Sequence, residues 1–248
     1  MIKPFLILQL RPDQASDDEF KAFLKYGELD EQDVVRIRME ENGIPEINLD
    51  DYSAIIVGGG PSNISDDEEK KEEYQKRFEA DMAPLLDEII EKDFPYLGAC
   101  YGIGSIVNHM GGVVSKEKYT EHVGAVDVEF TEQGIIDPLM NGLPKVFRAF
   151  AGHKEACQTL PDNVVLLAST KDCPIHLVRV KNNIYATQFH PELDVDGIIH
   201  RINTYKHAGY FPPEDADKLI AESEKERGKI TVPQEILKRF VEKYKTTI

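Results

Sequence analysis

The sequence predicts an α/β fold in which an open, mostly parallel sheet is flanked by helices and followed by a C-terminal helical extension. Six short apolar runs are bounded by turn residues and show little polar alternation, which is typical of strands buried on both faces. Helical patterns separate them, as parallel strands require. The predicted strands are residues 5–10, 34–39, 54–57, 95–99, 164–168 and 184–189. In such a sheet ligands bind at the carboxyl ends of the strands.

The clearest predicted helix covers residues 66–91. Its apolar residues fall on one stripe and charged residues fill the rest, which describes an amphipathic helix lying on a sheet. The stripe consists of Tyr74, Phe78, Met82, Leu85, Leu86, Ile89 and Ile90. Pro84 lies inside this pattern, and we expect it to kink or split the helix.

Composition narrows the class of function. The chain has 248 residues, 41% of them hydrophobic, and its 45 acidic and 29 basic residues give a net charge of −16. This charge opposes binding to nucleic acids or anionic membranes, so we expect a small-molecule substrate. The three cysteines form no CxxC pair, and the apolar run at residues 5–10 is too short for a signal peptide or a membrane span. Both features predict a cytoplasmic protein. CxxC and HxxxH spacings are absent, so the sequence predicts no metal site.

Two of the predicted strands end in unusual residues. After 54–57 comes the stretch Gly58–Gly60, whose bare N–H groups can approach a ligand closely or simply form a turn. No Gly-Lys-Ser/Thr follows, and the GxGxxG spacing is missing, so neither a Walker loop nor a dinucleotide fingerprint is predicted.

The other strand end reads "PYLGACYGIG" and contains Cys100. A strand, a glycine-lined bend and a helical pattern in this order are typical of a nucleophile elbow. At the amino end of a helix the thiol meets partial positive charge, which lowers its pKa. The N–H of Tyr101 is then placed to help bind an oxyanion. The alternative is that Cys100 is only a small buried apolar side chain.

A thiol nucleophile needs a base, and "YATQFHPELD" offers His190 just after a strand. In an extended segment residues i and i+2 point to the same side, so Glu192 can hydrogen-bond one imidazole nitrogen and leave the other for the thiol. The remaining histidines that we weighed are better explained as structural or exposed. They are His109, His176, His200 and His207.

Four motifs together resemble the class I, triad-type glutamine amidotransferases, most of all the glutaminase domain of GMP synthases. They are "IIVGGGPS", "PYLGACYGIG", "KDCPIHLV" and "YATQFHPEL", in this order. The resemblance implies a flavodoxin-like domain over residues 1–206. It implies that Cys100 attacks the amide of glutamine, that His190 shuttles protons and that Glu192 orients His190, with ammonia released from a γ-glutamyl thioester.

The same resemblance implies further roles. The backbone amides of Gly60 and Tyr101 would form the oxyanion hole, and Gly59 and Glu121 would lie on the substrate side. No metal or organic cofactor is implied. The segment "FAGHKE" corresponds to a stretch near the family's site, which implies that His153 contacts a partner or acceptor domain.

The sequence departs from the family in two places. Gly104 stands where the family usually has a glutamine that helps hold the substrate, and no synthase domain follows, so we expect that the chain does not make GMP by itself. Three functions stay open. They are release of ammonia from glutamine, with ammonia passing to a separate synthase subunit; hydrolysis of another γ-glutamyl compound; and a non-catalytic regulatory role.

Residues 207–248 form the predicted helical extension. Residues 214–227 predict a charged helix, and a second helix is marked by Thr231 as N-cap. The apolar stripe of this second helix comprises Val232, Ile236, Leu237, Phe240, Val241 and Tyr244. Either the stripe packs back on its own domain, or it forms the surface of a homodimer or a partner-subunit contact.

Overall fold

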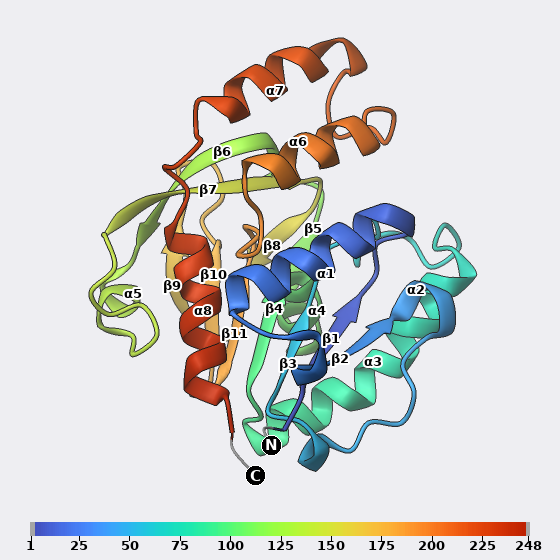
Figure 1. Cartoon of the computed structure of the whole chain (residues 1–248). Coiled ribbons are helices and arrows are strands. Elements are labelled where there is room, and N and C mark those ends of the chain that lie inside the picture. The colour runs from blue at the N-terminus through green and yellow to red at the C-terminus, as the bar shows by residue number, and fades with distance from the viewer. Residues whose placement is uncertain (1–2, 247–248) are drawn as a thin grey trace.

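The computed structural model describes residues 3–246, which form one large sheet, a small sheet and helices on both faces of the large one (Figure 1). The large sheet has the strand order β2 (Val34–Arg38), β1 (Phe5–Gln9), β3 (Ala54–Val57), β4 (Tyr96–Ala99), β11 (Ile184–Thr187), β10 (Leu177–Val180), β9 (Val164–Ser169), β6 (Glu121–Phe130) and β7 (Val146–His153). The small sheet pairs β5 (Val113–Ser115) with β8 (Ala156–Thr159). The helices are α1 (Asp13–Gly27), α2 (Met39–Asn42), α3 (Glu73–Lys92), α4 (Tyr101–His109), α5 (Glu132–Ile136), α6 (Val195–Thr204), α7 (Ala216–Glu224) and α8 (Val232–Tyr244).

The predicted fold class is confirmed, with one half of the sheet differing from a purely parallel pattern. From β2 through β1, β3, β4 and β11 each pairing is parallel, and from β11 through β10, β9, β6 and β7 each is antiparallel. The sequence predicted none of β5, β6, β7, β8 and β10. Strand β6 is buried only at Glu121, Val128 and Phe130 and is partly or fully exposed elsewhere, so it lacks the continuous apolar run that identified the others.

The two faces of the sheet separate the core into two clusters. In β1, Leu6 and Leu8 face α3 and α4, whereas Phe5 and Ile7 face α1 and α8. This alternation follows from the two-residue repeat of a strand, which sends successive side chains to opposite faces. Both faces are therefore covered, and the strands between them are apolar on both sides.

Helix α3 differs from its prediction at the start and at Pro84. It begins at Glu73 rather than at residue 66, and residues 66–72 form turns, one of them closed by the N–H of Lys70 donating to Asp67 O at 2.8 Å. Pro84 lies inside a continuous helix and does not split it. The ring faces solvent, where the lost hydrogen bond is satisfied most easily.

A third apolar cluster joins α6 and α7 to the ends of β6 and β7, above the carboxyl ends of the parallel strands (Figure 1). It contains Phe150, Ile198, Ile202 and Phe211, and the segment between the two helices runs through it. These helices form a cap, by which we mean residues 195–224. No helix within residues 3–246 is long and apolar enough to cross a membrane.

The apolar stripe of α8 packs back on its own chain, beside α1 on one face of the sheet (Figure 1). Ile236, Leu237 and Phe240 are fully buried there, so the stripe is not available as the contact surface of a homodimer or partner. Thr231 does occupy the N-cap position, but its side chain makes no capping hydrogen bond.

Because Phe240 is fully buried between α8 and the sheet, we expect Phe240→Ala to lower the free energy of unfolding by about 3–5 kcal/mol. Urea unfolding followed by circular dichroism measures this. Glu242→Ala, at an exposed position on the same helix, is the matched control and should change the value by less than about 0.5 kcal/mol. Equal, small effects of both substitutions would contradict the packing of α8.

Candidate active site

The residues of the candidate site follow the carboxyl ends of four neighbouring parallel strands. Arg11 follows β1, the stretch Gly58–Gly60 follows β3, Cys100 follows β4, and His190 lies three residues after the end of β11. Since these strands are adjacent and run in the same direction, their carboxyl ends meet at one edge of the sheet. The structure thereby brings together three segments that the sequence singled out separately, and adds Arg11 to them.

Cys100 occupies the bend between β4 and α4. Its backbone has φ 52° and ψ −90°, a conformation that residues other than glycine rarely adopt. Its N–H donates to Thr187 O at 2.7 Å, which ties the bend to the end of β11. Gly98 allows the close turn, because a Cβ there would lie 2.8 Å from the carbonyl carbon of Gly102. The geometry is that of a nucleophile elbow.

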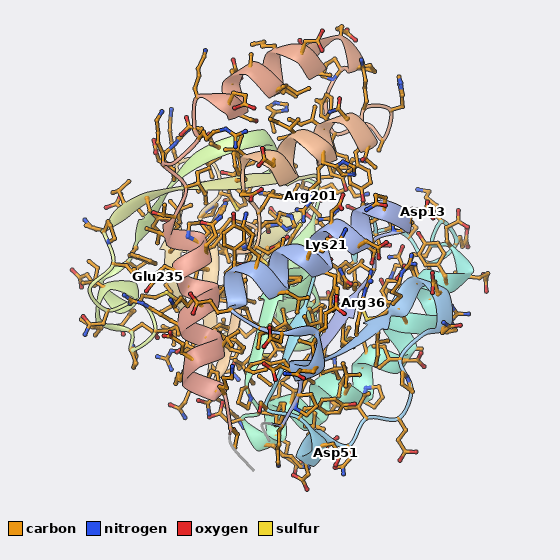
Figure 2. All side chains as sticks on the ribbon, in the orientation of Figure 1. Asp13, Lys21, Arg36, Asp51, Arg201 and Glu235 are labelled. Atoms are coloured by element: carbon orange, nitrogen blue, oxygen red, sulfur yellow. The ribbon has the colours of Figure 1, made fainter. Side chains whose placement is uncertain are left out.

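His190 and Glu192 are hydrogen-bonded, but not through the extended segment that we predicted. The N–H of Leu193 donates to His190 O at 3.3 Å, so residues 190–193 form a turn. The turn brings Glu192 Oε1 to 2.9 Å from His190 Nδ1. Arg201 of α6 donates from Nη2 to the same Oε1 at 2.7 Å. Figure 2 labels Arg201 where α6 faces α1.

The protonation states of these groups follow from burial. Burial lowers the pKa of His190 to about 4, against the opposing effect of Glu192, so the imidazole is neutral near pH 7. Burial acts to raise the pKa of Glu192, but the charges and hydrogen bonds of His190 and Arg201 outweigh it and keep the carboxyl ionised. The resting pair is thus a neutral imidazole oriented by a carboxylate.

The thiol differs from the prediction. We expected the start of α4 to lower the pKa of Cys100, whereas burial raises it to about 11. The guanidinium groups of Arg11 and Arg201 act in the opposite direction without overcoming this effect. At neutral pH Cys100 is therefore a thiol, and a base must remove its proton before it can act as a nucleophile.

The backbone amides of Gly60 and Tyr101 both border the cavities at Cys100. Within residues 3–246 neither N–H donates a hydrogen bond to another residue, so both are free for a ligand. Gly59 lies beside the reactive groups: a Cβ there would lie 2.5 Å from His190 Cε1 and 3.2 Å from Cys100 Cβ. Any side chain at position 59 would displace the imidazole or the thiol.

Two cavities meet at Cys100. They share Gly60, Gly152 and Tyr210. The first, of about 490 Å³ with its open mouth included, contains His190, Arg11 and Arg201 and is otherwise lined mainly by apolar and aromatic side chains, many of them from the cap. The second, of about 360 Å³ with its open mouth included, is lined by more polar side chains, among them Lys154, Glu155 and Gln188. We call them the apolar cavity and the polar cavity.

Gly104 lies in the polar cavity, opposite Glu155. A Cβ at Gly104 would be 3.6 Å from Glu155 Oε1, which is an ordinary contact, so position 104 lies directly beside this carboxylate. Glu155 is held by the N–H groups of Ile64 and Ser65, each at 2.9 Å, and by Ser65 Oγ at 2.7 Å. Gln188 donates from Nε2 to Cys100 Sγ at 3.8 Å.

Glu121, which we predicted on the substrate side, lines neither of the two cavities at Cys100. Its carboxylate accepts from His153 Nε2 at 2.9 Å, His176 Nε2 at 2.7 Å and Thr170 Oγ1 at 2.5 Å. His153 is buried in this network and lines the polar cavity, and its implied contact with a partner domain stays a prediction.

With Cys173, these side chains form a group of metal-type donors whose ligand atoms lie within 4.8 Å of one another. The sequence did not reveal this group, because its members lie far apart along the chain. The distances from Glu121 to the two imidazoles are those of hydrogen bonds, and the carboxylate is satisfied by its three donors. We therefore describe the group as a buried hydrogen-bond network.

Sequence reasoning missed several groups that the structure places at Cys100. They are Arg11, Lys154, Glu155, Gln188, Arg201, Tyr205 and Tyr210. Arg11 carried a usable signal, because it follows a predicted strand as the other site residues do. Arg201 and Tyr210 carried none, since only the packing of the cap brings them to the site.

Comparison with known proteins places the chain in a family. The sequence profile described as "Glutamine amidotransferase class-I" matches residues 24–196. Among curated proteins, GMP synthase [glutamine-hydrolyzing] of Thermosipho africanus is 34% identical over 142 residues, which are 57% of this chain and 24% of that protein. The same enzyme of Borreliella burgdorferi strain N40 is 33% identical over 151 residues, which are 60% of this chain and 26% of that protein. The chain thus spans about a quarter of the length of these relatives.

Solved structures share the fold. A glutamine amidotransferase from Thermotoga maritima superposes with a TM-score of 0.76 and 19% identity over 98% of each chain. A glutamine amidotransferase from Methylobacillus flagellatus superposes with a TM-score of 0.73 and 16% identity, covering 100% of this chain and 98% of that one. The matched profile covers more than half of the chain and includes Cys100, His190 and Glu192. The chain belongs to the class I glutamine amidotransferase family.

Proposed function

We propose that this protein is a cysteine hydrolase that releases ammonia from glutamine through a γ-glutamyl thioester on Cys100. One observation supports this most directly. Cys100 sits on a sharp strand-to-helix bend and lines the same cavity as His190, and the imidazole of His190 is oriented by Glu192 at 2.9 Å. A nucleophile, a base and a group that orients the base are the parts that acyl transfer needs.

In the first half of the reaction neutral His190 takes the proton of the Cys100 thiol, and the sulfur attacks the γ-carbonyl carbon of glutamine. The carbonyl oxygen becomes an oxyanion, and the free N–H groups of Gly60 and Tyr101, two residues that line the cavities, stabilise it. The carbon–nitrogen bond then breaks, and the imidazolium of His190 protonates the leaving nitrogen. Ammonia and the thioester result.

In the second half water attacks the thioester. His190 takes a proton from the water, the carbon–sulfur bond breaks, and the proton returns to the sulfur as glutamate leaves. Glu192 stays ionised throughout and stabilises the imidazolium that forms twice in each cycle. Arg201 positions Glu192 through its 2.7 Å hydrogen bond.

We propose that the glutamyl group occupies the polar cavity. A free α-amino acid carries an ammonium and a carboxylate, and this cavity offers the Glu155 carboxylate and the Lys154 ammonium to receive them. Gly104 lies beside Glu155 and has no side chain, so the binding that the family's glutamine usually provides falls to Glu155 and Gln188 in this chain.

The relatives are named GMP synthase [glutamine-hydrolyzing], and the chain matches about a quarter of their length. This supports the proposal that its ammonia passes to a separate synthase subunit. Hydrolysis of another γ-glutamyl compound is the second candidate, favoured by the size and apolar lining of the cavity on the His190 side. A non-catalytic regulatory role is disfavoured because packing alone does not require Cys100, His190 and Glu192 together.

We also propose that residues 207–248 act as an extension of a domain formed by residues 1–206. Two observations show how this extension packs on the rest of the chain. Helix α8 completes the core on one face of the sheet, and Tyr210 and Phe211 close the apolar cavity above Cys100.

A glutamine-analogue alkylator should label Cys100 once, and glutamine should prevent the labelling, because the substrate and the reagent compete for one site. Mass spectrometry of the digested protein locates the adduct. Cys157 and Cys173 are matched internal controls, since both are fully buried and should stay unlabelled. Cys100→Ala should lower glutamate formation by about a thousandfold or more. Glutamine turnover that survives this substitution would refute the proposed function.

The pH profile should reflect the neutral state of His190. Activity is lost as the pH falls through the pKa of His190, because a protonated imidazole does not accept the thiol proton. We expect the acidic limb of kcat/KM near pH 4, below the 6.5 of an ordinary histidine. Arg201→Gln removes a positive charge that lowers this pKa, so its limb should move to higher pH. Coincident limbs in the two proteins would show that His190 is not the titrating base.

A further inference from the structure

The two cavities at Cys100 receive opposite sides of the substrate. The group that protonates the leaving nitrogen must lie on the leaving-group side of the scissile bond. His190 lines the apolar cavity and not the polar one, whereas Lys154 and Glu155 line only the polar one. If the glutamyl group occupies the polar cavity, the leaving group therefore enters the apolar cavity.

The lining of the apolar cavity does not match ammonia. Ammonia has a single, polar non-hydrogen atom, whereas most of the surface around this cavity and its open mouth is carbon. Its walls include Val123, Leu193 and Ile198 together with the aromatic rings of Tyr205 and Phe211. Such a lining stabilises an apolar body of several carbon atoms and gains nothing from ammonia.

Two cations line this cavity, Arg11 and Arg201, and Arg11 lies beside the thiol. Arg11 is 5% exposed, and it donates from Nε to Glu19 Oε1 at 2.7 Å and from Nη1 to Tyr205 Oη at 3.3 Å. Within residues 3–246 its Nη2 donates no hydrogen bond. A Cβ at Gly59 would lie 3.1 Å from this Nη2 and 3.2 Å from Cys100 Cβ, so the unused donor lies next to the reacting atoms.

A guanidinium with a free edge is suited to a carboxylate, and its position next to the thiol limits where that carboxylate can be. It must lie within a few bonds of the scissile nitrogen. An α-amino acid meets this condition, because its carboxylate is attached to the carbon that bears the nitrogen. Its side chain is then left for the apolar walls.

We propose, resting on the second candidate above, hydrolysis of a γ-glutamyl compound other than glutamine, that the preferred substrates are γ-glutamyl dipeptides whose second residue is an apolar α-amino acid. The carboxylate of that residue binds Arg11, and its side chain packs under Tyr205 and Phe211 in the apolar cavity. Cys100 attacks the γ-carbonyl carbon, the amide bond breaks, and His190 protonates the departing amino group. Water completes the reaction, so the products are glutamate and the free amino acid.

Three substrates test this with the full-length protein: γ-glutamylphenylalanine, γ-glutamylphenethylamide, which lacks only the carboxylate, and glutamine. Release of glutamate, common to all three, is the measurement. We expect kcat/KM for the dipeptide to exceed the value for each of the other two by about tenfold or more. The leaving groups of the amide and of glutamine carry no carboxylate, so in both cases the buried guanidinium of Arg11 is left without a partner. Arg11→Met should reduce the advantage of the dipeptide over the amide, and Arg11→Lys should restore part of it.

Each of the other possible results would overturn one stated part of the proposal. Equal rates for the dipeptide and the amide would overturn the role of Arg11, and a preference for glutamine would overturn the dipeptide assignment and leave the apolar cavity as a passage for ammonia. In both cases the hydrolase function would stand. If none of the three substrates released glutamate and Cys100 resisted alkylation, the proposed function itself would fail. If Arg11→Met does not fold, the comparison of the three substrates in the unsubstituted protein still decides.

Discussion

The parallel pairing of β4 with β11 is the constraint on which the site depends. Thr187, the last residue of β11, is paired with Ala99 and accepts the N–H of Cys100 at 2.7 Å. The register of two strands thus holds Cys100 at φ 52°, a conformation that costs about 1–3 kcal/mol elsewhere in a chain. Because β11 continues toward His190, the same pairing fixes the base as well as the nucleophile. A slip of one residue would separate them.

Four buried charges extend this arrangement into the cap. Arg11 contacts Glu19 of α1, Arg201 of α6 contacts Glu192, and Arg201 also approaches Glu19 at 3.5 Å. The two positive groups are paired with the two negative groups, and buried charges are tolerated when they are paired in this way. Removing one member would leave an uncompensated charge, typically a loss of about 3–5 kcal/mol. The cap and the orientation of His190 therefore depend on one network.

The sequence predicted the site residues that belong to local patterns, and it missed those that come from distant parts of the chain. Cys100 with its glycines, and His190 with Glu192, are local patterns, and the parallel half of the sheet has continuous apolar runs. Arg201 and Tyr210 reach the site only through tertiary packing, so no local pattern marks them. The pKa of the thiol was predicted in the wrong direction for the same reason, because the start of a helix is visible in sequence and burial is not.

The cap also connects the substrate-facing cations to the segment that covers the site. The segment between α6 and α7 is held by Lys154, which donates to Ala208 O at 2.6 Å and lies over the ring of Tyr210, and by Tyr205, which contacts Arg11. Arg11 and Arg201 line the apolar cavity, and Lys154 lines the polar one. Lys154 and Arg11 therefore have two roles in the proposed mechanism: each faces the substrate, and each contacts the segment above Cys100.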